Sequence, residues 1–253
     1  MQARIVGFAR GARWLAEGWR LFRAAPLGWL VLVFAYLLLT NVIMFVPFIG
    51  VAAFLVLYPP FSVGLLAAAR AASRRAPLEI GMLFDGFRHG LRAQLLLGAI
   101  YLACSVVVFG GTILADDEEV LRAVLTGRRK GDELESGDIF VPLAVLATLY
   151  APVLMMFWFA PQLAAWHGIG PVKALFFSFV ACLMNWRALL VYGAATALAT
   201  LVLASGALFA VALASGGAMK IAPAALVLPL AIVLLPTLFA SFYASYRDVF
   251  GLE

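Results

Sequence analysis

Two short passages hold the residues best placed to do chemistry: "EGWR", which begins at Glu17, and "DGFR", which begins at Asp85. In each, a carboxylate is followed by glycine, an aromatic residue and arginine, and an acid coupled to charges in this way can acquire an unusual pKa. The alternative is an ordinary ion pair with a basic neighbour (Glu17 with Arg13 or Arg20, Asp85 with Arg88 or His89). We expect ion pairs, which contribute little at a wet surface.

The other reactive side chains form no recognisable catalytic or metal-binding set. The chain has two histidines, His89 and His167, and two cysteines, Cys104 and Cys182. No acid accompanies His167, and no spacing of histidine and cysteine suits a metal. Both cysteines lie in apolar surroundings and are expected to be small buried residues. We therefore expect a protein that is not an enzyme, with no catalytic residue, no cofactor and no metal.

The elements that carry these residues are predicted to be membrane helices. Of the 253 residues, 65% are hydrophobic and 12% are charged, and the mean hydropathy is +1.05; soluble domains average about 45–50% and about 25%. Stretches of about 20 apolar residues can span a bilayer. The six that qualify are Leu27–Val46, Ile49–Ala69, Ala93–Leu114, Ile139–Ala165, Ala188–Ala214 and Ala222–Tyr246.

The distribution of basic residues orients these spans. With the N-terminus in the cytoplasm, thirteen of the eighteen lysines and arginines fall on the cytoplasmic side, as the positive-inside rule requires. Both termini are then cytoplasmic. The outer loop at 115–138 holds eight acids and four bases; we interpret it as a solvated polar loop, the alternative being an acidic metal site. Because the basic residues flank apolar spans, the net charge of +5 favours anionic lipid over nucleic acid as the partner.

Helical wheels of the two passages separate charge from hydrophobicity. Residues 10–23 place arginines and Glu17 on one side and Trp14, Trp19 and Phe22 on the other. Residues 83–92 do the same, with Phe84 and Phe87 on the apolar side. This pattern is typical of helices that lie in the membrane interface. The arginines expected to contact anionic headgroups are Arg13, Arg20, Arg23, Arg88 and Arg92.

A weaker third copy at 171–187, with a face of small and polar residues, completes a pattern of three units. Each unit is an interfacial amphipathic helix followed by a hairpin of two spans, and the second span of each hairpin contains proline. The expected fold is thus an all-α membrane protein with six transmembrane helices in three quasi-repeats. Its segments are 1–26 (helix), 27–70 (hairpin), 75–92 (helix), 93–165 (hairpin with the loop 115–138), 171–187 (helix) and 188–246 (hairpin).

The segments "LFRAAPLGWLVL", "VPFIG", "FSVGLLAAAR" and "LFDGFR" resemble an uncharacterised proteobacterial family of six-span inner-membrane proteins. More distantly, "SFVACLMNWRALL" is similar to the membrane domain attached to some glycerophosphodiester phosphodiesterases. The resemblance implies a location in the bacterial inner membrane. The close family has no established activity, so it supplies no functional residue.

Two functions fit these observations. All acids and bases lie outside the six expected spans, and a proton-coupled pump needs such a residue inside the bilayer. We therefore expect a non-enzymatic inner-membrane protein that interacts with lipid or supports the envelope. The alternative is a transporter or permease component for an uncharged or amphiphilic solute, since proline-broken helices can line a cavity. The small-residue run from Gly193 to Ala218 allows a homo-oligomer or an unknown membrane partner.

Overall fold

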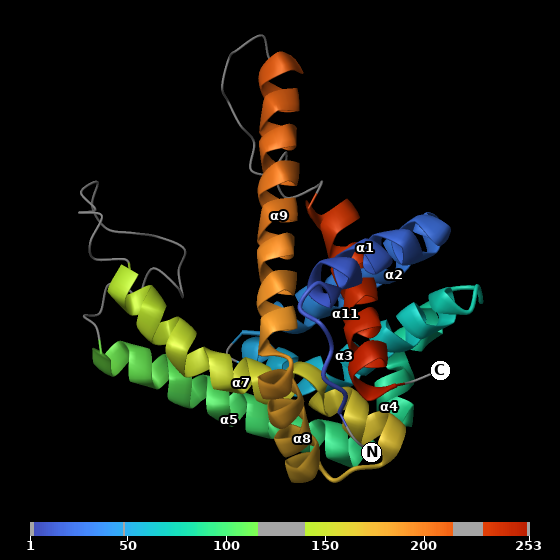
Figure 1. Ribbon diagram of the computed structural model, residues 1–253. Coiled ribbons are helices and arrows are strands. Elements are labelled where there is room, and N and C mark those ends of the chain that lie inside the picture. The colour runs from blue at the N-terminus through green and yellow to red at the C-terminus, as the bar shows by residue number, and fades with distance from the viewer. Residues whose placement is uncertain (1–2, 48, 116–139, 215–229, 252–253) are drawn as a thin grey trace.

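A computed structural model of the protein describes residues 3–47, 49–115, 140–214 and 230–251. Within these ranges the chain forms helices joined by turns, and no residue is in a strand (Figure 1). The helices in chain order are α1 (Arg10–Ala24), α2 (Pro26–Met44), α3 (Gly50–Ser73), the 3₁₀ turn η1 (Ile80–Phe84), α4 (Asp85–Arg88), α5 (Leu91–Ala115), α7 (Phe140–His167), α8 (Pro171–Met184), α9 (Trp186–Ala214), the π turn η2 (Leu230–Leu234) and α11 (Leu235–Phe250).

Among the described residues, five helices are long and apolar enough to cross a membrane. These are α2, α3 and the described apolar stretches of α5, α7 and α9. The sixth expected span, Ala222–Tyr246, is described only from Leu230 onward, where it is the turn η2 followed by α11. The protein is thus an all-helical protein with five candidate membrane helices. The outer loop 115–138 lies outside the described residues, apart from Ala115 at the end of α5.

The expected continuous helix over 75–92 is wrong. The chain is irregular up to Glu79, forms η1 and α4, and breaks again before α5. The second break is at Gly90, whose φ of +72° is a left-handed conformation that glycine adopts readily and other residues avoid. The hydrophobic pattern of this segment is helical, but its three glycines and Pro77 favour short turns. Similarly, Asn185 separates α8 from α9 within the expected helix 171–187.

Proline and glycine meet where α3 packs on α5. Pro60 has no N–H to give to the carbonyl of Val56, four residues earlier. Gly98 of α5 lies directly against that carbonyl, and a Cβ on Gly98 would be 2.0 Å from the oxygen. The backbones approach so closely only because Gly98 has no side chain. The neighbouring helix α5 thus covers the carbonyl that Pro60 leaves without a backbone donor. Such cover is needed where the surroundings are apolar.

Three helical segments, α1, α4 and α8, each pack on another helix at one small residue. Gly18 of α1 lies against the carbonyl of Thr237 in α11, and Gly86 of α4 lies against the carbonyl of Pro60 in α3; an added Cβ would be 2.3 Å and 2.2 Å from these oxygens. In α8 the small residue is Ser178, whose Oγ donates to the carbonyl of Met155 in α7 (2.7 Å). Two of these partner helices, α3 and α7, come immediately before their segments, whereas α11 joins α1 from the opposite end of the chain.

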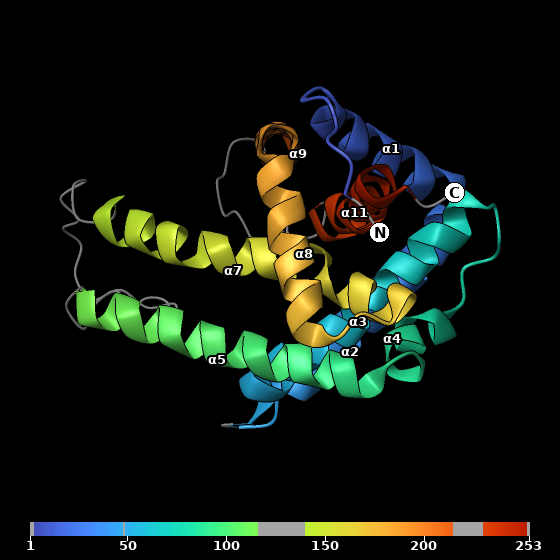
Figure 2. The same cartoon turned by 60° about the horizontal axis from the view of Figure 1, so that its bottom comes forward.

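The core of the described protein lies around the ends of the chain, where these contacts are made. Its largest fully buried side chains include Trp14, Trp29, Phe159 and Tyr246. Away from this core, α5 and α7 project together to one side and α9 stands by itself (Figures 1 and 2). Ala188 and Tyr192 near the start of α9 are buried, but from Gly193 to Val211 no residue of α9 is buried. The protein is therefore well packed at one end and exposes apolar helix surface at the other, as a membrane protein does.

Candidate functional site

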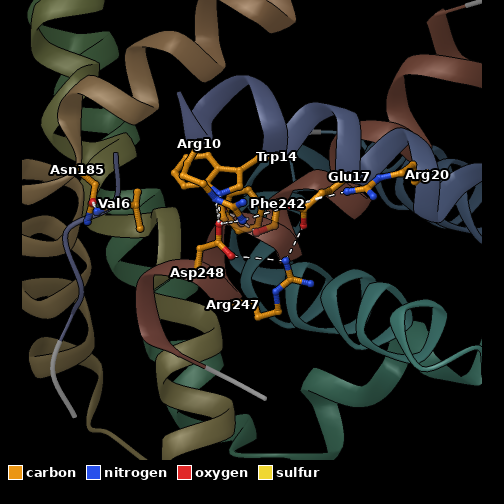
Figure 3. Close-up of polar contacts among 10 residues, drawn as sticks. Val6, Arg10, Trp14, Glu17, Arg20, Asn185, Phe242, Arg247 and Asp248 are labelled. Atoms are coloured by element: carbon orange, nitrogen blue, oxygen red, sulfur yellow. Dashed lines mark hydrogen bonds and ion pairs between the residues drawn. The ribbon is translucent and has the colours of Figure 1, made fainter. Parts of the chain in front are cut away.

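Charged side chains from both ends of the chain meet between α1 and α11 (Figure 3). We call Arg10, Glu17, Arg247 and Asp248 the terminal charge cluster. Arg10 donates from Nε to Oδ2 of Asp248 (2.7 Å) and from Nη2 to Oε1 of Glu17 (3.2 Å). Arg247 donates from Nη2 to Oε2 of Glu17 (2.5 Å). Each carboxylate is thus paired with a guanidinium, and Glu17 bridges both arginines.

Trp14 ties this cluster to the core. Its indole Nε1 donates to Oδ2 of Asp248 (2.8 Å), and its ring packs edge-on against Tyr192 of α9 with centroids 6.1 Å apart. Trp14 is 0% exposed, while the side chains of Glu17 and Asp248 are 14% and 13% exposed. Ion pairs this shielded from water interact more strongly than surface pairs. Losing one partner is costly because it leaves the other charge unpaired.

The pKa of Arg247 reflects this environment. Burial alone lowers it, but the hydrogen bond and charge of Glu17, together with the charge of Asp248, outweigh burial and raise the pKa above its ordinary value. Arg247 therefore stays charged at neutral pH. The cluster is an electrostatic link between α1 and α11.

The interfacial interpretation of α1 needs correction on its apolar side. Trp14 and Phe22 do not face lipid, because they are buried inside the protein. Gly11 lies on the same side against the backbone of Ala188 in α9, and a Cβ there would be 2.1 Å from the carbonyl oxygen. Protein thus covers much of the face that we expected to enter the membrane. Trp19, which is 39% exposed, is the large ring of α1 that remains accessible.

The segment before α1 is fixed to the rest of the protein by its backbone. The amide of Arg4 donates to the carbonyl of Val249 (2.8 Å), and its carbonyl accepts from Nδ2 of Asn185 (3.1 Å). Oδ1 of the same asparagine accepts from the amide of Val6 (2.8 Å; Figure 3). Asn185 is buried between α8 and α9. One side chain therefore anchors an extended segment that lacks regular structure of its own.

The five arginines expected to bind lipid are all exposed: Arg13, Arg20, Arg23, Arg88 and Arg92. Arg20 is 3.9 Å from Glu17, and the guanidinium of Arg23 lies 5.7 Å from the ring centre of Trp19. Arg13, Arg20 and Arg23 belong to α1, whereas Arg88 ends α4 and Arg92 lies in the first turn of α5. The structure therefore presents these side chains outward from separate helices.

The two carboxylates of the repeated passages differ in their surroundings. Glu17 pairs chiefly with Arg10 and Arg247, so the expected pairing with Arg13 is wrong and that with Arg20 is a minor contact. Asp85 lies 3.6 Å from Nδ1 of His89, one of the two partners expected for it. Asp248, the second acid of the cluster, was not among the residues expected from the sequence. Its neighbour Arg247 does not mark it as part of a site, because its partners Arg10 and Trp14 lie more than 230 residues away.

Most serine and threonine side chains within the apolar helices donate to a carbonyl of their own helix, whereas the two buried glutamines bond to neighbouring helices. Gln94 of α5 is 0% exposed and donates from Nε2 to the carbonyl of Pro161 in α7 (2.8 Å). Gln162 donates to Oγ of Ser62 in α3 (3.3 Å). Both cysteines are free thiols, and burial raises the pKa of Cys182 to about 12, which makes this thiol unreactive. In the described ranges, no group of three His, Cys, Asp or Glu residues could hold a metal.

Comparison with known proteins gives one informative relative. A probable inner membrane protein of Burkholderia thailandensis is 40% identical over 261 residues, which cover 100% of this chain and 95% of that protein. No family model matches the chain, so the distant similarity to the glycerophosphodiester phosphodiesterase membrane domain finds no support. No solved structure matches it either.

Proposed function

The chain belongs to the family of that Burkholderia inner membrane protein and is a multi-pass membrane protein, and from this premise we propose that it is a non-enzymatic protein that binds anionic lipid through the exposed arginines of its interfacial segments. The observation that carries the proposal is the outward position of Arg13, Arg20 and Arg23, while the opposite face of α1 is docked on α9 and α11. A helix fixed in this way presents a constant row of guanidiniums.

A second segment supports contact with lipid. The outer side of α8 exposes Val172, Phe176 and Phe177 next to Lys173, and these residues line a hollow of about 710 Å³ with Gly168 and Gly170. An apolar surface beside a basic residue suits the boundary between acyl chains and headgroups. At the start of α9, which follows α8 directly after Asn185, the guanidinium of Arg187 lies 5.3 Å from the ring centre of Trp186. This pairing is also suited to the interface.

Charge removal from the arginine face tests the proposal. The variant with Arg13, Arg20, Arg88 and Arg92 changed to glutamine is expected to retain much less phosphatidylglycerol. At about 1 kcal/mol per basic residue near an anionic surface, the loss of affinity is on the order of a hundredfold or more. Retained lipid is measured by mass spectrometry after purification from nanodiscs that contain phosphatidylglycerol and phosphatidylcholine.

The matched control removes the same charge from the expected outer loop by changing Arg122, Arg128, Arg129 and Lys130 to glutamine. This variant is expected to retain phosphatidylglycerol nearly as the unchanged protein does. Equal retention by the two variants would mean that net charge, and not the arginine face, determines binding. Undiminished retention in the first variant would end the proposal.

The three packing contacts also support a repeated architecture. In the proposed arrangement each unit begins with a short segment that docks, at Gly18, Gly86 or Ser178, on the second helix of a hairpin. The docking of α1 on α11 closes the series into a ring. In this arrangement the sixth span is the expected stretch Ala222–Tyr246, which ends before Arg247 and Asp248, and both termini are cytoplasmic.

The proposed orientation predicts the behaviour of reporter fusions. Green fluorescent protein at the C-terminus is expected to fluoresce, and alkaline phosphatase there to be inactive, because residue 253 is placed in the cytoplasm. Alkaline phosphatase inserted within 115–138 is expected to be active. An active phosphatase at the C-terminus would require an odd number of spans or the opposite orientation.

A further inference from the structure

A hollow of about 410 Å³ lies beside the terminal charge cluster, where the first residues of the chain meet the end of α11. Its lining brings together three arginines, one aspartate and small or apolar residues, namely Arg4, Arg10, Arg247, Asp248, Val6, Gly7 and Gly251. None of the five arginines that we assign to the lipid-binding face lines it. The hollow is thus a separate feature of the same end of the protein.

The charges at the hollow do not balance. Arg10 and Arg247 are paired with the carboxylates of Asp248 and Glu17. Arg4 also lines the hollow, and among the described residues its guanidinium has no carboxylate partner. Within the part of the chain that the structure describes, three guanidiniums face two carboxylates, which leaves one excess positive charge there. Because Oδ2 of Asp248 already accepts bonds from Arg10 and Trp14, this carboxylate is not free to neutralise Arg4.

Arg4 is held in position although its side chain is exposed. Its backbone is fixed to Val249 and to Asn185 by the two hydrogen bonds described above. Gly251 has a φ of +67° and no side chain, which lets the guanidinium lie close: a Cβ on this residue would be 2.8 Å from Cζ of Arg4. A cation that is already positioned loses less entropy when it binds an anion.

The N-terminus of α1 adds a second electrostatic contribution that favours an anion in the hollow. The helix begins at Arg10, which lines the hollow, and no side chain caps this end. The positive end of the helix dipole therefore acts together with the guanidiniums. Guanidinium groups match the geometry of phosphate oxygens and bind them with paired hydrogen bonds.

We propose that this hollow is a binding site for a phosphate group, carried either by an anionic phospholipid headgroup or by a soluble phosphate. The headgroup case rests on the proposed lipid-binding function and gives it a defined site; the soluble case is independent of it. Arg4 is the residue that the phosphate engages first, and Arg10 and Arg247 share the negative charge.

The experiment uses the full chain in nanodiscs of phosphatidylcholine. In one arm inorganic phosphate is titrated and its binding is followed by phosphorus NMR line broadening; in the other arm phosphatidylglycerol is added to the bilayer and retained lipid is counted by mass spectrometry. Arg4→Gln is expected to weaken binding at least fivefold in one or both arms, and the responding arm identifies the source of the phosphate. Arg4→Lys is expected to lie between Arg4→Gln and the unchanged protein, because lysine keeps the charge but not the paired donors.

The matched control is Arg74→Gln, which removes one exposed arginine at the end of α3 and is expected to change neither arm. If Arg4→Gln behaves like Arg74→Gln in both arms while unfolding at the same temperature, the phosphate site is wrong. The two proposals can fail separately. If Arg4→Gln binds normally and the fourfold arginine variant loses binding, only the phosphate site in the hollow is overturned. Loss in Arg4→Gln alone supports the hollow and overturns the arginine face.

Discussion

Trp14→Ala is expected to destabilise the folded protein by about 3–5 kcal/mol, the usual range for removing a large buried ring. The side chain is fully buried, packs against Tyr192 and donates to Asp248. Its removal leaves a void between α1, α9 and α11 and takes one hydrogen bond from a carboxylate that is largely shielded from water. Thermal unfolding of the purified protein in one detergent, followed by tryptophan fluorescence and by helical circular dichroism, measures the loss.

Two further variants separate the causes. Trp14→Phe keeps most of the ring but removes the Nε1 donor, so it is expected to lose about 1–3 kcal/mol, as for a hydrogen bond to a charged group. Trp19→Ala is the control on the same helix; because Trp19 is 39% exposed, it is expected to lose far less than Trp14→Ala. Similar losses for Trp14→Ala and Trp19→Ala would show that α1 is not docked as described.

Gly18→Ala is expected to give the second large effect. The new Cβ would be 2.3 Å from the carbonyl oxygen of Thr237 and 2.6 Å from Cβ of Ser241. Because the closest atom is a backbone oxygen, which cannot rotate away, α1 must move away from α11. Overpacking of this kind costs about 1–3 kcal/mol or more. A loss of stability would be informative, because alanine otherwise stabilises a helix by about 1 kcal/mol relative to glycine. The unfolding temperature is therefore expected to fall.

Gly193→Ala is the matched control, since Gly193 is also a helical glycine but has nothing within 4 Å of the added Cβ. It is expected to be neutral or slightly stabilising. Gly86→Ala tests the corresponding contact on α3, where the Cβ would be 2.2 Å from the carbonyl of Pro60. A series in which Gly18→Ala is as stable as Gly193→Ala would contradict the packing of the two terminal helices.

The sequence alone locates the apolar helices well. The expected span Leu27–Val46 is the helix Pro26–Met44, and Ala188–Ala214 is the helix Trp186–Ala214. This success has a simple cause: a bilayer demands a long uncharged helix, and such a stretch is visible in the residues themselves. Breaks at single residues, such as Gly90 and Asn185, are harder to foresee because hydrophobic periodicity continues across them.

Only part of the candidate site could be predicted from the sequence. Trp14 follows Arg10 by four residues and therefore lies beside it on α1, where both donate to Asp248; a helical wheel does not show whether lipid or protein covers Trp14 and Phe22. That depends on α11, whose Arg247 and Asp248 meet Arg10 and Glu17 across almost the whole chain. No short-range pattern encodes a contact of this separation. The exposed arginines, in contrast, were identified because nothing distant covers them.

The docking of α1 on α11 has a consequence for biosynthesis. Residues 10–24 leave the ribosome long before their partner at 235–250 is made. While the remaining helices enter the bilayer, the indole of Trp14 and its neighbours have no permanent cover. Contacts between distant parts of a chain also form slowly. Synthesis of α11 is thus the event that lets α1 settle, and a product terminated before α11 would carry an uncovered tryptophan surface for proteases and chaperones to recognise.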